Sequence, residues 1–354
     1  MSLKTNLKIL PIVIVNWNGT KDTIECITSV EASTYKNWRI VLVDNNSSVH
    51  EIEMLKSFIT DKKQISLIQN DKNIGFAKAN NQAIRYCDEN LDDWDCCFLL
   101  NNDTTIAKDC LAKVYSHFQS RSLNLVSTKM VLYDNRNILD NVGHKMLNTG
   151  EIIPIGHKEA VLKYVTESEN LGPCGGACLI SRSLIKDIGL FDDYFSTGYE
   201  DAELGLRSYI SGYTSGYCPE AIVYHKKGMA IKKVFDSKYA IRTQINILYT
   251  YFKLMPITLV VLNLPFMVIR YLLIILASIL LLRWKYASII AKAIWQFLTV
   301  EIKTVIQKRR EFYTKIDSVS NLKILQKQEF FLKYDLNRSW KYLIERQPSA
   351  LDTY

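Results

Sequence analysis

The stretch Ile12–Gly19 reads IVIVNWNG, in which four β-branched residues lead directly into a polar turn. The same pattern returns at Ile40–Ser47 (IVLVDNNS) and at Cys96–Thr104 (CCFLLNNDT), and another short apolar run covers Ile65–Ile68. Short apolar runs that are bounded by turn residues are typical of strands buried on both faces. We therefore expect strands at Ile12–Val15, Ile40–Val43, Ile65–Ile68 and Cys96–Leu100.

Amphipathic segments follow these runs, and each has the spacing of apolar residues expected of a helix. The alternation predicts an α/β fold, with a mostly parallel sheet that is covered by helices on both faces. Sheets of this kind bind ligands outside the carboxyl ends of their strands. The polar residues after each strand are therefore the first candidates for a site. The expected helices are Thr23–Ala32, Glu51–Ile59, Ala77–Tyr86, Leu111–Phe118 and, later in the chain, Asp201–Ser211.

The charge of the chain is concentrated near its C-terminus. The 354 residues carry a formal net charge of +8, and 283–346 hold 14 Lys and Arg against 6 Asp and Glu. A basic segment beside an apolar one indicates an anionic membrane surface as a partner. Nucleic acid is the other usual partner of a basic patch, but no nucleic-acid recognition motif is present, so we expect no nucleic-acid binding.

The apolar segment Ile257–Leu282 allows two interpretations. Its length suits a membrane span, either as a single helix or as a hairpin that turns at Pro265, but Arg270 near its middle would be costly in lipid. The alternative is a pair of helices that lie in the interface, and Trp284 and Trp295 suit the depth of the lipid headgroups. A pair of core helices in a wholly soluble protein is the structural interpretation of the same segment. Because no apolar signal segment begins the sequence, we expect a reducing, cytoplasmic setting in which the eight cysteines are buried thiols.

Five polar clusters are candidates for chemistry, and each also has a structural interpretation. Asp103 follows an apolar strand, where a carboxylate can hold a divalent cation, although Asn and Asp are equally common in turns and helix caps. Asp44 follows another strand and could accept the N3–H of a pyrimidine base. Gly75 permits the backbone to approach a ligand closely.

The other two clusters lie in the second half of the sequence. Glu200 and Asp201 stand near an expected helix start, where the helix dipole stabilises carboxylates, and either could act as a general base. His225 after a strand is more often structural. It becomes a candidate metal ligand only if it meets Asp103 in space.

Taken in order, the clusters resemble glycosyltransferase family 2, which has the Rossmann-like GT-A fold, and most of all its rhamnosyltransferase-like branch. The likeness covers Ile12–Lys253. It implies a catalytic domain over 1–253, with a nucleotide-binding half at 1–125 and an acceptor half at 126–253, followed by a helical membrane-association region at 254–354. The segments that carry the likeness are IVIVNWNG, VLVDNNS, NIGFAKANNQAI, FLLNNDT, GGACLISR, FDDYFSTGYEDAELGLR and VYHKKG.

The resemblance also implies a role for each matching residue. Asp44 would read the base with the help of Asn16 and Asn73, and Asp201 would be the catalytic base with Glu200 on its acceptor side. The metal, Mn²⁺ or Mg²⁺, would be held by Asp103 and His225, although the family's first aspartate is Asn101 here. The other implied positions are Gly75, Asn80, Asn101 and Asn102 for the nucleotide-sugar, Gly175, Gly176 and Ala177 for the acceptor, and Arg242 for the diphosphate, in a Tyr-x-x-Arg element that starts at Tyr239 and has Thr243 in place of Asn.

The implied activity is inverting transfer of one sugar, of rhamnose, galactose or glucose type, from a UDP- or dTDP-sugar. The acceptor would be a glycan or a polyprenyl-diphosphate-linked sugar, at the cytoplasmic face of the cell membrane, in the synthesis of surface polysaccharide. A processive synthase is disfavoured because the tail has one apolar stretch and no QxxRW motif. A nucleotidyltransferase is disfavoured because no Gly-rich, Lys-containing phosphate loop is present. A sugar-nucleotide-binding protein or a membrane scaffold without transfer activity is the remaining alternative.

Overall fold

The computed structural model of the protein describes residues 8–196, 198–226, 237–316 and 319–343, with side chains as far as residue 338. Contacts divide the chain into two compact units. The first comprises 1–144 and 154–236, and the second comprises 145–153 and 237–354. The division falls before helix α7 (Ser237–Leu254), which the sequence placed at the end of the catalytic domain. The reason is that α7 packs against α9 and α10, which belong to the second unit.

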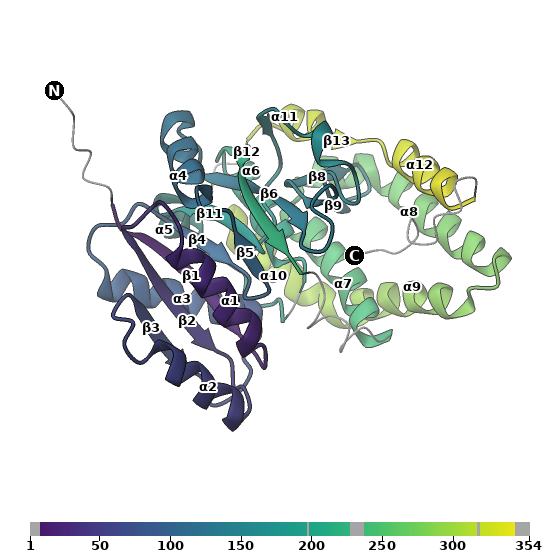
Figure 1. Ribbon diagram of the computed structural model, residues 1–354. Coiled ribbons are helices and arrows are strands. Elements are labelled where there is room, and N and C mark those ends of the chain that lie inside the picture. Colours follow the sequence, from purple (N-terminus) through teal and green to yellow (C-terminus); the bar gives the residue numbers. More distant parts are fainter. Residues whose placement is uncertain (1–7, 197, 227–236, 317–318, 344–354) are drawn as a thin grey trace. The chain divides into compact units, whose positions relative to one another are not determined.

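The first unit alternates strands and helices from its N-terminus (Figure 1). All four strands expected in 1–125 form, as do the four expected helices there and the later one at Glu200–Ile210. The elements are β1 (Leu10–Asn16), α1 (Thr20–Glu31), β2 (Trp38–Asp44), α2 (Val49–Ile59), β3 (Ile65–Gln69), α3 (Phe76–Asn90), β4 (Cys96–Leu100), β5 (Thr104–Ile106), α4 (Cys110–Arg121), β6 (Leu125–Leu132), β7 (Leu139–Asn141), a 3₁₀ turn η1 (Val161–Lys163), β10 (Ser168–Glu169), β11 (Ala177–Ser181), α5 (Arg182–Ile188), α6 (Glu200–Ile210) and β12 (Ser215–His225).

The main sheet has the strand order β10-β12-β6-β11-β4-β1-β2-β3, with β5 paired to β12 and β7 to β6. Strands β3, β2, β1 and β4 are parallel, as the sequence predicts, and β12 is parallel to β6. The sheet is nevertheless mixed, because β11 runs antiparallel to both β4 and β6. That orientation brings the start of β11, at Ala177, beside the end of β4, at Leu100.

Helices cover both faces of the parallel strands. Side chains of α1, α2 and α4 form one core cluster with alternate strand residues such as Ile12 and Phe98. Helix α3 contacts β1 and β2 but contributes nothing to that cluster, so it covers the other face. Strands enclosed in this way need apolar residues at successive positions, which is why IVIV at the start of the sequence is a reliable signal. Seven of the eight cysteines are buried thiols, as expected, and Cys174 is half-buried.

The second unit consists of helices and a small sheet. The hairpin of β8 (His144–Leu147) and β9 (Ile152–Pro154) forms a three-stranded sheet with β13 (Gln328–Glu329). Helix α8 continues through Pro265 without a break, so the hairpin at that proline suggested by the sequence is wrong. The remaining elements are α7 (Ser237–Leu254), α8 (Ile257–Leu280), α9 (Trp284–Gln296), a π turn η3 (Phe297–Glu301), α10 (Ile302–Tyr313), α11 (Asn321–Gln326) and α12 (Phe331–Leu343).

Candidate functional site

The predicted site residues of the first unit gather at one edge of the sheet. Parallel pairing places Asn16, the last residue of β1, opposite Asp44, the last residue of β2. Strand β4 lies on the other side of β1 and ends one residue before Asn101. The carboxyl ends of these three strands are neighbours because the strands are parallel. This placement is where open α/β sheets bind their ligands.

Asn16 and Asp44 form the centre of a buried hydrogen-bond network. The Asn16 amide donates to Asp44 Oδ1 at 2.8 Å, and Ser47 donates to the same carboxylate through its hydroxyl at 2.6 Å and its backbone N–H at 3.0 Å. Both residues are fully buried. In this structure Asp44 therefore holds the turn after β2, and its predicted reading of a base stays a prediction.

Asn102 extends this network to helix α1. Its side-chain amide donates to Thr23 Oγ1 at 3.1 Å and to Asn16 Oδ1 at 3.3 Å. The amide nitrogen also lies 2.7 Å from where a Cβ on Gly19 would stand, so a side chain at position 19 would displace it. Asn102 therefore fixes the loop after β4 against α1.

The loop before α3 is tied to the loop before α6. The Asn73 side chain accepts the Gly75 N–H at 2.9 Å and an amide hydrogen of Asn45 at 2.8 Å. Gly75 has a φ of +84°, and a Cβ there would stand 2.7 Å from the backbone oxygen of Ser196. The predicted close approach at Gly75 thus exists, and in this structure its partner is protein backbone. Asn80 is buried and its amide donates to Phe76 O at 2.9 Å, and its predicted contact with the nucleotide-sugar stays a prediction.

Asp103 and His225 meet, as the sequence required of a metal site. Their Oδ1 and Nε2 atoms lie 3.3 Å apart, because β5 pairs with the end of β12 and brings Thr104 opposite His225. The other ring nitrogen of His225, Nδ1, lies 2.7 Å from Oδ2 of Asp140. Burial acts to lower the pKa of His225, but the carboxylates of Asp103 and Asp140 outweigh it and raise the pKa to about 9.

Sequence reasoning missed Asp140, and no motif signals it. It lies on β7, a three-residue strand, in a loop-rich part of the chain. A carboxylate on the far nitrogen of a histidine fixes the ring's orientation, and the near nitrogen becomes a metal ligand when a cation displaces its proton. Among the residues that the structure describes, no group of three or more His, Cys, Asp or Glu side chains converges as a metal site. Asp103 and His225 lie close enough to serve together as metal ligands, and this role stays a prediction.

Lys226 anchors the end of β12 to helix α1. Its ammonium lies 2.6 Å from Asp22 Oδ1 and 2.5 Å from Glu25 Oε2, and its backbone N–H donates to Asp103 O at 3.0 Å. Tyr133 donates a further hydrogen bond to Glu25 at 2.6 Å. Lys226 thus holds the strand end that carries His225. Lys227 and Gly228, the rest of the predicted VYHKKG element, lie outside the described residues, as does Thr197.

Asp201 lies in the first turn of α6 and is held by backbone N–H groups. Its Oδ2 accepts from Gly175 at 2.8 Å and its Oδ1 from Ala202 at 2.7 Å. Gly176 in turn accepts the Asn101 N–H at 2.8 Å, so the Gly175–Gly176 segment links Asp201 to the loop that carries Asp103. Ala177 packs into the core cluster, so within the predicted acceptor segment the contact with Asp201 comes from Gly175.

Two buried titratable groups, Glu200 and His144, interact electrostatically with Asp201. Burial, and then the adjacent charge of Asp201, raises the pKa of Glu200 to about 8, and its Oε2 atom has no hydrogen-bond partner among the described residues. His144 was not predicted. Burial lowers its pKa, and the charge of Asp201 acts in the opposite direction. Burial and the neighbouring Asp201 thus favour the protonated form of Glu200.

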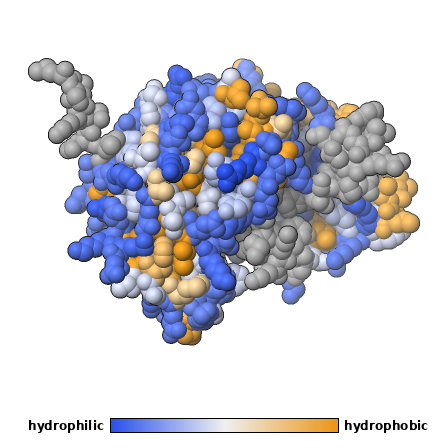
Figure 2. Space-filling model, viewed as in Figure 1, coloured by the Kyte–Doolittle hydropathy of each residue, from blue (hydrophilic) through white to orange (hydrophobic). Residues whose placement is uncertain are grey.

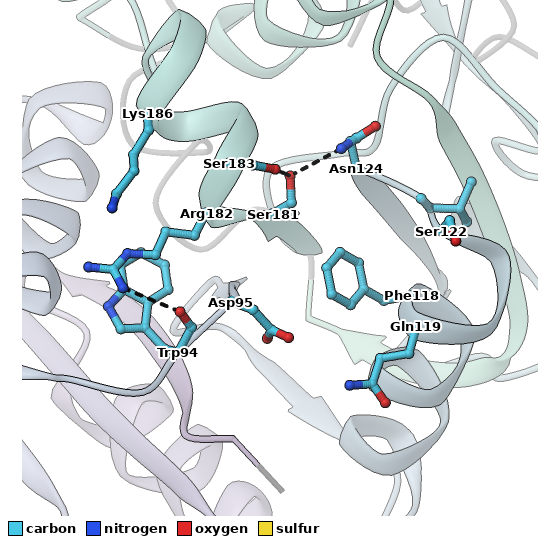
Figure 3. Close-up of a pocket in the computed structure, with 11 residues that line it drawn as sticks. Trp94, Asp95, Phe118, Gln119, Ser122, Asn124, Ser181, Arg182, Ser183 and Lys186 are labelled. Carbon is cyan, nitrogen blue, oxygen red and sulfur yellow. Dashed lines mark hydrogen bonds between the residues drawn. The ribbon is translucent and has the colours of Figure 1, made fainter.

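Two features fall outside this cluster. Arg242 belongs to the second unit, where its guanidinium pairs with Glu301 at 2.9 Å, and its predicted contact with a diphosphate stays a prediction. A pocket of about 520 Å³ in the first unit (Figure 3) contains none of the predicted residues. The pocket lies at the opposite end of the central strands, before β4 and β6 begin. There Arg182 stacks on Trp94 at 4.4 Å and pairs with Asp88.

The sequence profile described as "Glycosyl transferase family 2" matches residues 12–189, half of the chain. The chain belongs to glycosyl transferase family 2. The profile spans every strand and loop from Asn16 to Gly176 that forms the edge described above, so this family 2 enzyme is a nucleotide-sugar glycosyltransferase by membership. Its placement in the rhamnosyltransferase-like branch stays a prediction.

Curated relatives and solved structures of glycosyltransferases resemble this family 2 chain. It is 24% identical over 241 residues to the "Low-salt glycan biosynthesis hexosyltransferase Agl10" of Haloferax volcanii, covering 67% of this chain and 73% of that protein. It is 33% identical over 81 residues to the putative colanic acid biosynthesis glycosyl transferase WcaA of Escherichia coli, covering 22% and 28%. The crystal structure of GalNAc-T7 with UDP, GalNAc and Mn²⁺ superposes with a TM-score of 0.56 at 16% identity, over 70% of this chain and 48% of that one. The last likeness shows the shared GT-A-like fold, and the chain spans about half the length of that structure.

Proposed function

We propose that the protein is an inverting, metal-dependent transferase that moves one sugar from a UDP- or dTDP-sugar to a hydroxyl of a glycan or of a polyprenyl-diphosphate-linked acceptor. The observation that supports this most is the chain of contacts from Asp103 and His225, through Asn101 and Gly176, to the carboxylate of Asp201. It joins a cation-binding pair and a candidate base within one edge of the sheet.

The donor would bind along the ends of β1 and β2. Asp44 Oδ2 accepts one N–H, from Ser47, and can accept a second, such as the N3–H that uracil and thymine share. Asn16 would fix that carboxylate, while Asn73 and Gly75 shape the adjoining loop. Because Asp44 is fully buried, its covering side chains must move when a base binds.

The residues at the end of β4 fit a divalent cation. Asp103 and His225 supply an oxygen and an imidazole nitrogen, a donor set that suits Mn²⁺, and Asp140 fixes the imidazole from behind. The remaining ligands would be diphosphate oxygens and water. When bound, the cation offsets the negative charge that develops on the leaving diphosphate. The Mn²⁺ in the structure of GalNAc-T7 is consistent with this proposal.

The transfer itself needs a base on the acceptor side. Asp201 would take the proton of an acceptor hydroxyl as that oxygen forms its bond to the anomeric carbon and the bond to the diphosphate breaks, with inversion. Two backbone N–H groups, of Gly175 and Ala202, hold the carboxylate in place. Glu200, protonated at neutral pH, keeps a second negative charge away from Asp201 and can donate a hydrogen bond to a sugar hydroxyl.

We place this reaction at the cytoplasmic face of the cell membrane, in the synthesis of a surface polysaccharide. One helix, Ile257–Leu280, is long and apolar enough to cross a membrane by length and composition, and a basic segment follows it. Agl10 of Haloferax volcanii, by its name, acts in glycan biosynthesis. A polyprenyl-linked acceptor would be presented at such a surface.

The test is the release of nucleoside diphosphate from a panel of UDP- and dTDP-linked rhamnose, galactose and glucose. Each donor is incubated with Mn²⁺ and a lipid extract that contains polyprenyl-linked glycans. The proposal predicts release from one donor class that depends on both extract and metal, and that Asp201→Asn abolishes. Nucleotide binding without extract-dependent release from any donor would instead favour a sugar-nucleotide-binding protein.

A further inference from the structure

Helix α8 has one face that packs against its own unit. The buried positions recur at helical spacing along its length, and they include the polar residues Asn263 and Arg270. Asn263 donates to Gln328 at 3.0 Å, next to the small sheet. This face therefore packs against the rest of its unit along most of the helix.

Arg270, the only charged residue of α8, is paired on this inner face. Its guanidinium contacts Asp335 of α12 at 2.8 and 3.0 Å, Glu151 at 2.5 Å and Thr149 at 3.0 Å. Arg270 has 7% of its surface exposed. The sequence counted this arginine as a charge in the middle of a span, but the structure turns it away from the outer face.

Apart from Thr258, whose hydroxyl accepts a hydrogen bond from Asn321 at 2.6 Å, the outer face of α8 is apolar, and the residues that the structure describes leave its large apolar side chains exposed. These side chains are each between 42% and 73% exposed. A patch of this length exceeds what a soluble monomer ordinarily leaves in water. Figure 2 shows apolar residues gathered at the end of the second unit where α8 turns into α9. The exposed side chains are Ile257, Val261, Leu262, Leu264, Val268, Ile269, Leu272, Leu273, Leu276 and Leu280.

Helix α9 adds exposed tryptophan and lysine at helical spacing beside this patch. Trp284 and Trp295 are 59% and 70% exposed, and Lys285 and Lys292 are also exposed. Tryptophan prefers the headgroup level of a bilayer, and lysine near an anionic surface adds electrostatic attraction. The exposed lysines beside the apolar patch therefore suit a surface of anionic lipid.

We propose that α8 lies in the plane of one leaflet of an anionic phospholipid bilayer, with its outer face in the acyl boundary and Arg270 on the protein side. The inference rests on the membrane location proposed above and adds the geometry of the contact. A spanning α8 would carry Arg270, Glu151 and Asp335 to the middle of the hydrocarbon, together with the charged helix α12 that is bound to it. An in-plane helix buries the apolar stripe and leaves the ion pairs intact.

Depth measurements with spin labels separate the two orientations. Leu262, Ile269 and Leu276 are 51%, 50% and 53% exposed, and a spacing of seven residues puts them on nearly one face, about 10 Å apart along the axis. Each is replaced by cysteine in a Cys174→Ser background, labelled, and bound to vesicles of 70% phosphatidylcholine and 30% phosphatidylglycerol. The in-plane helix predicts three equal, shallow depths. A label at position 269 about 10 Å deeper than the other two would overturn the proposal in favour of a span.

A matched pair of variants tests the surface itself. Leu272→Glu/Leu276→Glu places two charges on the outer face, and Leu162→Glu places one on an 84% exposed leucine of the first unit. We expect at least a tenfold loss of vesicle binding for the double variant, no loss for Leu162→Glu, and unchanged thermal unfolding for both. Equal vesicle binding by all three proteins would contradict the proposal. So would a dimer, seen by sedimentation, that fails to bind vesicles and that the double variant dissociates.

The proposed glycosyltransferase activity is tested by a separate measurement. Hydrolysis of the nucleotide-sugar by water needs no membrane acceptor, so the double variant should retain it in full. Loss of hydrolysis with normal vesicle depth would count against the proposed function alone. Normal hydrolysis with unequal label depths would count against the in-plane helix alone.

Discussion

The Oδ2 atom of Asp140 lies 2.7 Å from Nδ1 of His225. This contact fixes the orientation of the imidazole ring, so that the other nitrogen, Nε2, faces Asp103. Asp140 and His225 are separated by 85 residues, and pairing of β6 with both β7 and β12 brings them together.

Removing Asp140 should weaken metal binding without removing a ligand. For Asp140→Asn we expect a 10- to 100-fold higher Mn²⁺ requirement for nucleotide binding, the range found for partners of metal ligands. The measurement is the Mn²⁺ dependence of UDP or dTDP binding. His157→Gln is the matched control, because it changes a neighbour of Asp140 without changing a proposed metal ligand. An unchanged Mn²⁺ requirement in Asp140→Asn would show that the ring needs no such support.

Asp201→Asn should separate catalysis from donor binding. Asparagine keeps the size of the side chain and cannot accept a proton, so we expect transfer to fall by about 10²- to 10⁴-fold while the Kd for nucleotide changes little. Acceptor-dependent release of nucleoside diphosphate and calorimetric titration report the two quantities. Glu53→Gln, on the exposed side of α2, serves as the control. Transfer within threefold of the wild-type rate in Asp201→Asn would exclude Asp201 as the base.

The buried Glu200 should make stability depend on pH. Its folded pKa of about 8 lies above the ordinary value of 4.5, so between these values the folded state binds more protons than the unfolded state. Stability therefore falls as pH rises through this window. In Glu200→Gln this contribution is absent, so its melting temperature relative to wild type should be higher at pH 9 than at pH 5. Parallel curves of melting temperature against pH for the two proteins would contradict the assignment.

Gly75 links the donor loop to the loop before α6, and alanine should break that link. Gly75→Ala meets both a positive φ and the Ser196 oxygen, whereas Gly189→Ala meets a similar φ of +77° with no atom within 4 Å. Strained φ alone costs about 1 to 3 kcal/mol. Urea unfolding should therefore show a larger loss of stability for Gly75→Ala than for Gly189→Ala. Equal losses would mean that the contact with Ser196 gives way freely.

The sequence predicted the parallel half of the fold because those strands are enclosed on both faces, which leaves an unbroken apolar run such as IVIV. It could not predict that β11 runs antiparallel, since ACLIS is equally compatible with either direction. The sequence made contact between Asp103 and His225 the condition for a metal site, and the structure shows that contact. Asp140 and His144, and the contacts of Lys226 with Asp22 and Glu25, were missed because they arise from long-range pairing and burial. Neither long-range strand pairing nor burial leaves a local pattern in the sequence.

The same limit applies to Asp44 and Arg270. The motif around Asp44 predicted a base-reading residue at the end of a strand, but not the hydrogen bonds by which Asp44 closes the turn at Ser47. The composition of α8 suggested a span that is interrupted by a charge. Only the positions of Glu151 and Asp335 reveal that the charge lies on the inner face.

The central claim is that Asp103 and His225 bind a nucleoside diphosphate through a divalent cation. Calorimetric titration of UDP and of dTDP, with Mn²⁺ and with chelator, into wild type, Asp103→Ala and His225→Ala tests it most directly. The account predicts that one or both nucleotides bind to wild type with Mn²⁺, that each substitution weakens binding by tenfold or more, and that chelator abolishes it. Binding that is equally tight in chelator and in both variants would contradict the account.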